Sequence, residues 1–210
     1  MKIVLFGANG NIGQRMVREA LNRRFEVTAV VRDAKKWTEQ HDSLRVVEGD
    51  IMNPDSVASI SEGHEAVVSA YGPPFGGEEA LLEAARSLVE GVRRVGVTRL
   101  LVVGGAGSLE VSPGLQLMDT PDFPEEYRPL AIAHAEALRI YSESDLDWTY
   151  LSPAATIESG RRTGQFRIGT DKLVLDEADR SYISIQDFAA AMIDEVEDPY
   201  FSRTRFTVAY

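Results

Sequence analysis

Apolar and polar positions along the chain follow two different periods. Residues 2–6 form a short apolar run that ends at Gly7, which is typical of a strand buried on both faces. From Asn11 the apolar positions recur on one helical face, at Ile12, Met16, Val17, Ala20 and Leu21. Glu26–Val31 is the next strand-like run. This order of strand, glycine turn, helix and strand predicts a βαβ unit.

The same alternation continues. Further strands are predicted at Leu44–Glu48, Glu65–Ala70, Arg99–Val103 and Asp147–Leu151. Helices are predicted at Asp55–Ser61, 78–95 and Tyr127–Ser144, and Pro54 is placed to start the first of them. A repeated strand–helix order favours an α/β fold of the Rossmann type, with a doubly wound parallel sheet.

The C-terminal part has a looser pattern. Glycines punctuate strand-like runs at Gln165–Ile168 and Lys172–Leu175, and a helix at Ile185–Val196 and a strand at Thr204–Val208 follow. A length of 210 residues suits one domain. We expect residues 1–210 to form a single nucleotide-binding domain, in which residues 153–210 add a small substrate-side region beside the carboxyl edge of the sheet.

Composition narrows the function classes. The formal net charge of −11 and the pI of about 4.8 disfavour nucleic acid as a partner. The chain has no cysteine, and no apolar run is long enough to span a membrane. No signal-like segment begins it, so a cytoplasmic location is expected. Both a monomer and a homodimer fit this composition.

The turn after the first strand is the main candidate site. Gly7, Gly10 and Gly13 are spaced three apart, and Asn9, Asn11 and Ile12 lie between them. A helix N-terminus at the carboxyl edge of a doubly wound sheet suits a pyrophosphate, and glycines let the phosphates approach the backbone. The alternative is a tight turn without a ligand. No Gly-Lys-Ser/Thr follows, so the competing phosphate loop is absent.

The spacing Gly-x-x-Gly-x-x-Gly resembles the short-chain dehydrogenase/reductase superfamily, particularly its extended and atypical branches. The runs GGAGSLEV, LDWTYLSPAA, SYISIQDFAAAMIDEVE and RFTVAY resemble its small atypical members called NADH-flavin reductase-like or NmrA-like proteins. The resemblance implies a bound NAD(P) cofactor. It also implies that adenine contacts Asp50 and Ile51, that Ser69, Ala70, Tyr71 and Gly72 line the cofactor, that Gly104 and Gly105 form the nicotinamide-side wall, and that Pro153 lies beneath the nicotinamide.

The residue after the second strand bears on the choice between NADP(H) and NAD(H). An acid at this point would bind both ribose hydroxyls, whereas an arginine would bind a 2′-phosphate. Here Arg32 takes the position, with Lys35 and Lys36 nearby, which favours NADP(H). The alternative is that Arg32 is solvated and that Asp33 turns towards the ribose.

The usual proton donor of this superfamily is missing. Tyr127 is followed four residues later by Ala131 instead of lysine, and no lysine occurs in Tyr127–Ser144. Ser108 and His134 are the catalytic candidates, although Ser108 equally suits a turn cap and a lone helical histidine is often a core-edge residue. The three histidines have no ligand-like spacing, so no metal site is expected.

A substrate that accepts a bare hydride needs no proton donor. Flavins and quinones are such planar acceptors, and the stretches YGPPFGG (71–77) and LMDTPDFPEEY could form walls for a flat ring. The sequence therefore predicts an NAD(P)H-dependent oxidoreductase that passes hydride to a flavin, a quinone or a similar acceptor. The alternatives are a redox sensor that binds NADP(H) without catalysis, as NmrA-like regulators are thought to do, and a nucleotide-sugar epimerase.

Overall fold

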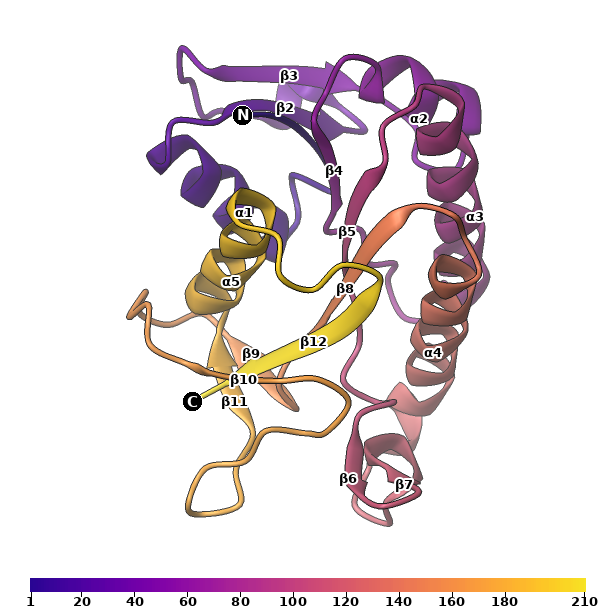
Figure 1. The fold of residues 1–210 in the computed structure, drawn as a ribbon, viewed down its shortest axis with the longest axis vertical. Helices are drawn as coiled ribbons and strands as arrows, with labels where there is room; N and C mark the ends of the chain where they lie inside the picture. Colours follow the sequence, from indigo (N-terminus) through magenta and orange to yellow (C-terminus); the bar gives the residue numbers. More distant parts are fainter.

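The computed structural model describes residues 1–210, and its main sheet has eight strands in the order β10-β12-β8-β5-β4-β1-β2-β3 (Figure 1). All neighbours are parallel except β10, which is antiparallel to β12. The strands of this sheet are β1 (Lys2–Phe6), β2 (Glu26–Val31), β3 (Leu44–Glu48), β4 (Ala66–Ser69), β5 (Arg99–Val103), β8 (Asp147–Ser152), β10 (Arg167–Gly169) and β12 (Thr204–Ala209). The chain order reverses between β1 and β4, and this switch point is where such sheets bind their ligands.

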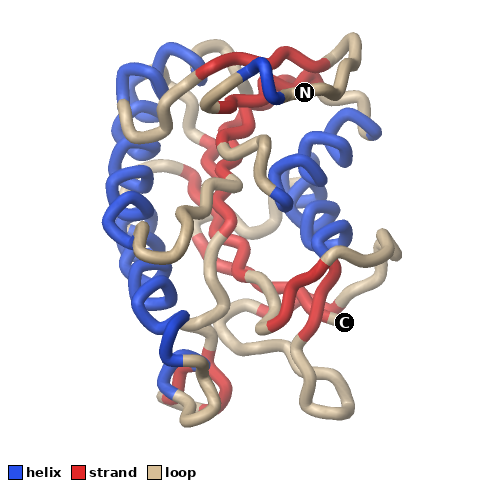
Figure 2. The backbone as a smooth tube through the Cα atoms, turned by 180° about the vertical axis from the view of Figure 1, so that it is seen from behind, coloured by secondary structure: helices blue, strands red, loops and turns tan.

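Five helices cover the two faces of the sheet. They are α1 (Asn11–Asn22), α2 (Pro54–Ser61), α3 (Glu78–Arg94), α4 (Arg128–Ser142) and α5 (Ile185–Glu197). Helices α1 and α5 pack together on one face, and α2, α3 and α4 lie on the other (Figures 1 and 2). None of the five combines the length and the apolar character needed to cross a membrane.

The central strands are apolar throughout because each contributes to two cores. Along β1, Ile3 and Leu5 pack into the core shared with α1 and α5. Val4 and Phe6 point the other way, into the core shared with α2, α3 and α4. Successive side chains of a strand point to opposite faces, so a strand covered on both sides is a continuous apolar run.

Short elements gather at the carboxyl edge of the sheet. Two small sheets pair β6 with β7 and β9 with β11, and three 3₁₀ turns lie in the loops. Their bounds are β6 (Glu110–Ser112), β7 (Leu115–Gln116), β9 (Thr156–Glu158), β11 (Tyr182–Ser184), η1 (Ala34–Lys36), η2 (Leu117–Asp119) and η3 (Glu125–Tyr127).

A buried carboxylate fixes the loop after β9 to the start of α5. Asp187 is fully buried and accepts hydrogen bonds from the backbone N–H groups of Thr163 and Gly164, each at 2.8 Å, and from the Tyr210 hydroxyl at 2.6 Å. Burial works to raise the pKa of Asp187, but these hydrogen bonds outweigh it and hold the pKa below its ordinary value. The C-terminal region is therefore an ordered part of the carboxyl edge.

The Rossmann-type fold predicted from the sequence is confirmed, but one predicted strand is wrong. Residues 172–175 form no strand: Lys172 makes a single bridge to Glu110, and the segment continues as loop. Residues 153–210 supply α5, the edge strand β10 and its neighbour β12, as well as small elements at the carboxyl edge. Their substrate-side role stays a prediction.

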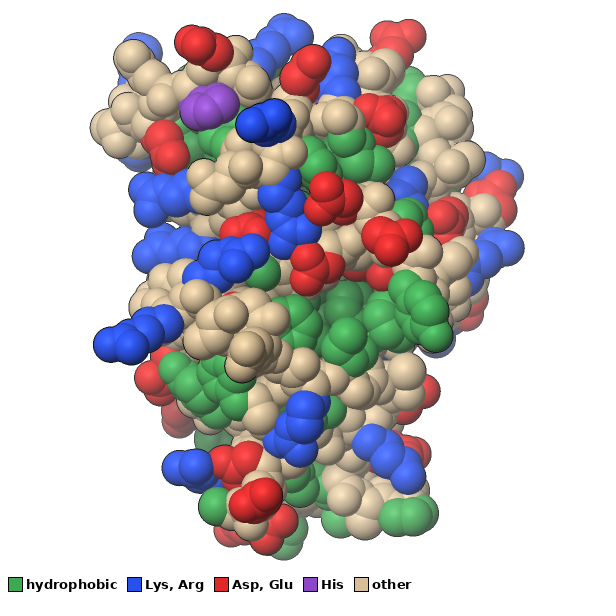
Figure 3. Space-filling model, turned by 60° about the vertical axis from the view of Figure 1, so that its left-hand side comes forward, with side chains coloured by type: hydrophobic (Ala, Val, Ile, Leu, Met, Phe, Trp, Pro, Cys, Tyr) green, Lys and Arg blue, Asp and Glu red, His purple; other side chains and the backbone are tan.

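The net negative charge does not give a uniformly acidic surface. The face that carries α1 and α5 mixes basic and acidic side chains around gathered apolar ones (Figure 3). Several arginines there are held by carboxylates, as in the ion pairs of Arg23 and Arg162 with Glu19, each at 2.7 Å.

Candidate functional site

The turn between β1 and α1 requires two of its three glycines for its own packing. Gly7 has a φ of 73°, and a Cβ on it would lie 2.7 Å from the backbone carbon of Ala70. A Cβ on Gly13 would lie 2.2 Å from the carbonyl oxygen of Gly7. Helix α1 can therefore start this close to β1 and β4 only because both residues lack a side chain.

Gly10 is glycine for a different reason. Its φ of −73° is available to any residue, and a Cβ on it would meet only the Gly7 carbonyl oxygen, at 3.3 Å. Gly10 immediately precedes α1, where no side chain caps the helix, whereas Asn53 caps α2 and Ser184 caps α5. The fold itself makes little demand for glycine here, so the glycine leaves the helix N-terminus open to a ligand.

This N-terminus has the chemistry of an anion site. The first N–H groups of a helix, here those of Asn11, Ile12 and Gly13, have no partner within the helix, and the helix dipole adds positive potential. The side-chain amide of Gln14 donates to the carbonyl oxygen of Asn9 at 3.0 Å and so steadies the preceding turn. A pyrophosphate fits this arrangement of donors.

Arg32 has no ion-pair partner, whereas Asp33 contacts its own turn. Arg32 follows β2, is exposed and forms no ion pair. The Asp33 carboxylate instead accepts a hydrogen bond from the Lys35 backbone N–H at 3.1 Å and lies 3.6 Å from the Lys36 ammonium. The geometry therefore favours Arg32 as the residue that faces a ligand, although neither cofactor preference is established by it.

Arg15 is a basic residue that the sequence reasoning did not single out. It is half-buried on α1 and has no carboxylate partner. Arg18, one turn further along, pairs at 3.1 Å with Glu39 in the segment after η1, so this side of α1 faces the β2–β3 connection. Arg15 thus lies on the same side, one turn nearer the glycine turn. The sequence gives no signal for Arg15, because an arginine on the polar face of an amphipathic helix is ordinary.

Asp50 and Tyr71 lie beside Arg32 at the carboxyl edge. The Asp50 carboxylate accepts from the Met52 N–H at 2.9 Å, which orders the turn that contains Ile51. Burial raises the pKa of Tyr71, the charge of Arg32 acts to lower it, and Asp50 acts to raise it. Residues that follow three different strands thus share one electrostatic environment.

The residues at the end of β4 and just after it are the next ones predicted to line the cofactor. Ser69 is buried, and its Oγ accepts a hydrogen bond from the Tyr71 N–H at 3.4 Å. The backbone of Ala70 packs against Gly7, as described above. A Cβ on Gly72 would meet nothing within 4 Å, so the backbone there is open.

Gly104 and Gly105 are required by neighbouring side chains. A Cβ on Gly104 would lie 1.9 Å from the ring of Tyr150, and one on Gly105 would lie 2.8 Å from the ring of His134. Packing within the chain accounts for both glycines. The nicotinamide-side role predicted for them stays a prediction.

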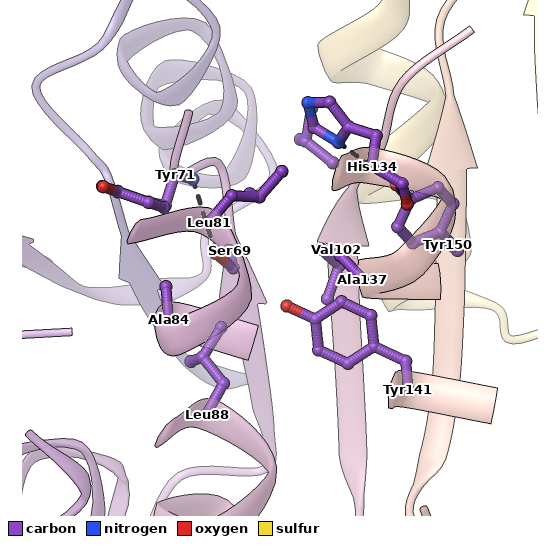
Figure 4. Close-up of a pocket in the computed structure, with 11 residues that line it drawn as sticks. Ser69, Tyr71, Leu81, Ala84, Leu88, Val102, His134, Ala137, Tyr141 and Tyr150 are labelled. Atoms are coloured by element: carbon purple, nitrogen blue, oxygen red, sulfur yellow. Dashed lines mark hydrogen bonds between the residues drawn. The ribbon is translucent and has the colours of Figure 1, made fainter. Parts of the chain in front are cut away.

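Tyr150 and His134 form a hydrogen-bonded pair in the wall of a small cavity between the sheet, α3 and α4 (Figure 4). The Tyr150 hydroxyl donates to the His134 carbonyl oxygen at 2.9 Å and accepts from the Gly105 N–H at 3.3 Å. Nδ1 of His134 lies 3.2 Å from the same hydroxyl. The Tyr150 hydroxyl donates its proton to the His134 carbonyl oxygen, so it can only accept from the His134 ring. We therefore assign the ring proton of His134 to Nδ1, which leaves Nε2 as an acceptor.

Both members of this pair are poor acids at neutral pH. Burial lowers the pKa of His134 to about 4, so the ring is neutral. Burial also raises the pKa of Tyr150 above its ordinary value. The cavity of about 10 Å³ has room for about one water molecule. A catalytic role for His134 stays a prediction, and it would be that of a neutral acceptor.

Ser108 is held by an arginine of the C-terminal strand. Its Oγ accepts a hydrogen bond from Arg205 Nη1 at 2.9 Å, and Arg205 is held in turn by Asp171 at 2.7 Å. Ser108 is buried, with 8% of its surface exposed. The structure gives this hydroxyl a structural contact, and its catalytic role stays a prediction.

The chain has no Tyr-x-x-x-Lys pair. The chain has four lysines: Lys2 on β1, Lys35 and Lys36 in η1, and Lys172 beside β6. Pro153 directly follows β8, and Ala155 after it donates its N–H to Ser181 Oγ at 3.1 Å. No group of three or more acidic or histidine side chains is arranged to hold a metal ion.

The residues present fit a dinucleotide. The open helix N-terminus at Gly10, the unfilled space at Gly72 and the free guanidinium of Arg32 lie along the carboxyl edge where the strand order reverses. This combination of fold and site defines a Rossmann-type nucleotide-binding protein. The model of the NAD(P)H-binding family matches residues 7–199, and the chain belongs to this family, within the atypical short-chain dehydrogenases/reductases.

Known proteins resemble the chain over its whole length. An uncharacterized protein of Bacillus subtilis is 42% identical over 212 residues, which cover 99% of this chain and 98% of that protein. A crystal structure from Streptococcus pneumoniae, provisionally named an NADH-flavin reductase, has a TM-score of 0.87 at 31% identity and covers 100% and 99% of the two chains. Another from Bacteroides thetaiotaomicron, provisionally named an epimerase, has a TM-score of 0.94 at 42% identity and covers 100% and 96%.

Proposed function

We propose that the protein is an NADPH-dependent reductase that passes hydride to a flat, conjugated acceptor such as a flavin or a quinone. The observation that carries this proposal is the lack of a proton donor at the site. The Tyr–Lys pair is absent, His134 is neutral with a pKa of about 4, and burial raises the pKa of Tyr150. An acceptor that takes its proton from water needs no such donor, whereas a ketone or aldehyde does.

The residues of the chain then act by binding and positioning. The N–H groups at the start of α1 hold the pyrophosphate, and Gly10 and Gly72 let the dinucleotide approach the backbone. Bound NADPH supplies a hydride, two electrons with one proton, and water supplies the second proton of the reduced acceptor. Nε2 of His134 accepts a hydrogen bond from a polar edge of the acceptor, which orients the ring.

The preference for NADPH is part of this proposal. Arg32 is exposed and forms no ion pair. Arg15 lies on the side of α1 that faces the β2–β3 connection, and it also forms no ion pair. A guanidinium binds a 2′-phosphate by paired hydrogen bonds, and it gains nothing comparable from a ribose hydroxyl.

One assay tests the proposal. The purified protein is mixed with NADPH and, in turn, riboflavin, FMN and a set of quinones, and the loss of nicotinamide absorbance is followed. Turnover with at least one acceptor supports the reductase. NADPH binding by calorimetry together with no turnover across the set overturns it and favours the redox sensor.

An epimerase is the second candidate because the Bacteroides relative carries that name. Inverting a sugar centre through a keto intermediate needs a group that takes and returns a proton at the site. Neither Tyr150 nor His134 has a pKa suited to both steps. Direct assay with nucleotide sugars and NAD distinguishes the two functions.

A further inference from the structure

We propose that Phe75 and Tyr127 form a slot for the flat ring of the acceptor, and that the carboxylates around it select an uncharged acceptor over a phosphorylated one. This rests on the reductase proposed above. It names the class of substrate: a neutral conjugated ring such as riboflavin or a quinone.

The two aromatic rings touch across separate loops. Their centroids lie 5.1 Å apart with the ring planes tilted by 60°. Phe75 is 63% exposed and Tyr127 is 43% exposed, so both expose large apolar surface to solvent. Surface aromatic residues gathered in this way commonly mark a binding site.

The pair stands at the start of the two helices that line the cavity. Phe75 lies two residues before Gly77, the residue that precedes α3, and Tyr127 directly precedes α4. The first turn of α3 places Leu81, and the second turn of α4 places His134, in the wall of the cavity, opposite each other in Figure 4. A ring held by Phe75 and Tyr127 would therefore lie at the N-terminal ends of α3 and α4, the ends that carry Leu81 and His134.

The rings of Phe75 and Tyr127 are too close together to admit a third ring between them, so Phe75 must move outwards. A flat ring stacked between two others needs a centroid separation of about 7 Å, because each stacked layer takes about 3.5 Å. The chain around Phe75 permits the movement. Gly76 has a φ of 82°, and a Cβ on Gly76 or Gly72 would meet no atom within 4 Å. Little packing holds this segment in place.

Four carboxylates lie next to the slot residues in sequence, at the start of α3 and in η3. Glu78 and Glu79 form the first turn of α3, and Glu125 and Glu126 belong to the turn that contains Tyr127. The nearby cation, Arg128, is already shared between Glu125 at 3.0 Å and Asp119 at 3.6 Å. A phosphate group on the acceptor would meet repulsion here, which salt screens over a Debye length of about 8–10 Å.

Riboflavin and FMN give a matched pair of probes, since they share one ring system and differ by a phosphate. We expect a lower KM for riboflavin than for FMN, and a KM for FMN that falls as sodium chloride is raised while that for riboflavin stays constant. An equal KM for the two, or a lower one for FMN at low salt, overturns the selection of uncharged acceptors.

Variants test the slot itself. Phe75→Ala and Tyr127→Ala are expected to raise the KM for riboflavin about fivefold or more, with kcat and the KM for NADPH nearly unchanged. Phe75→Tyr and Tyr127→Phe should behave as the wild type. Tyr200→Ala is the matched control, because Tyr200 is 84% exposed and contacts another ring, that of Phe201 at 5.0 Å, on a different part of the surface.

Quenching of riboflavin fluorescence by the protein alone separates the two proposals. Turnover with riboflavin that is insensitive to Phe75→Ala and Tyr127→Ala overturns the slot and leaves the reductase standing. Quenching that both variants weaken, without turnover of any acceptor, supports the slot and overturns the reductase. Neither quenching nor turnover overturns both.

Discussion

The hydroxyl group of Tyr150 lies 2.9 Å from the carbonyl oxygen of His134 and 3.2 Å from its Nδ1, so one strand residue fixes both the backbone and the ring of a helix residue. The same hydroxyl receives the Gly105 N–H at 3.3 Å. Strand β8, helix α4 and the loop after β5 are thereby joined at a single buried atom.

Replacing Tyr150 by phenylalanine should cost about 1–3 kcal/mol of unfolding free energy, because the Gly105 N–H and His134 would lose their buried partner. Urea unfolding measures the change. Tyr141→Phe is the matched control: Tyr141 is also buried, in the same cavity, and its hydroxyl makes no hydrogen bond to the protein. Equal losses in the two variants would contradict the role assigned to the Tyr150 hydroxyl.

The stability of the protein should fall as the pH decreases from about 6.5 to about 4. His134 has a pKa of about 4 in the folded chain, lowered from an ordinary value of 6.5. The unfolded chain therefore binds a proton in this range that the folded chain does not, so His134 contributes fully above pH 6.5 and loses its contribution, about 3 kcal/mol, as the pH falls to 4.

Urea unfolding at a series of pH values tests this dependence. Burial also lowers the pKa of His64, which adds to the slope in the wild type. His134→Gln should flatten the curve. A curve for His134→Gln that parallels the wild type would show that His134 does not titrate as the structure indicates.

The glycine turn predicts opposite outcomes for two similar variants. Gly13→Ala should prevent normal folding, because its methyl group would lie 2.2 Å from the Gly7 carbonyl oxygen. Gly10→Ala should fold, with one added contact at 3.3 Å, but should bind NADPH at least about tenfold more weakly because the methyl group occupies the phosphate approach. Circular dichroism and calorimetric titration give the two readouts. Unchanged NADPH affinity in folded Gly10→Ala would place the pyrophosphate elsewhere.

Cofactor choice should depend on two arginines. Arg32→Ala is expected to weaken NADPH about tenfold or more and to leave NADH within about twofold, since a charged hydrogen bond to the 2′-phosphate is lost. Arg15→Ala should act in the same direction and more weakly. Arg18→Ala, at the neighbouring turn of α1, is the control because Arg18 is already paired with Glu39. An equal loss for both cofactors would assign Arg32 to another part of the dinucleotide.

The sequence predicts the central sheet well because the information is local. The run Arg99–Val103 is buried along its whole length, and the apolar stripe of α1 faces one core, so both leave a clear periodic pattern. Strands β9 and β11 have three residues each and pair with each other across a long stretch of chain. Strands this short show no recognisable alternation of apolar and polar residues. Lys172–Leu175 shows the reverse error, since three consecutive apolar residues there lie in a loop.

The same limit applies to the site. The glycine turn and Arg32 are recognisable because their roles depend on near neighbours in sequence. The contact of Tyr150 with His134 depends on how a helix and a strand pack, and the strand DWTYL gives no sign of it. Arg15 looks like any polar-face residue of an amphipathic helix until the structure shows that it has no partner.

The close fit of Gly104 beneath the ring of Tyr150 has an evolutionary consequence. No side chain fits at position 104 while the Tyr150 ring keeps its place, so a substitution at position 104 requires a change at position 150 first. We expect relatives of this chain that have a tyrosine in the strand equivalent to DWTYL to keep a glycine after the fifth strand as well.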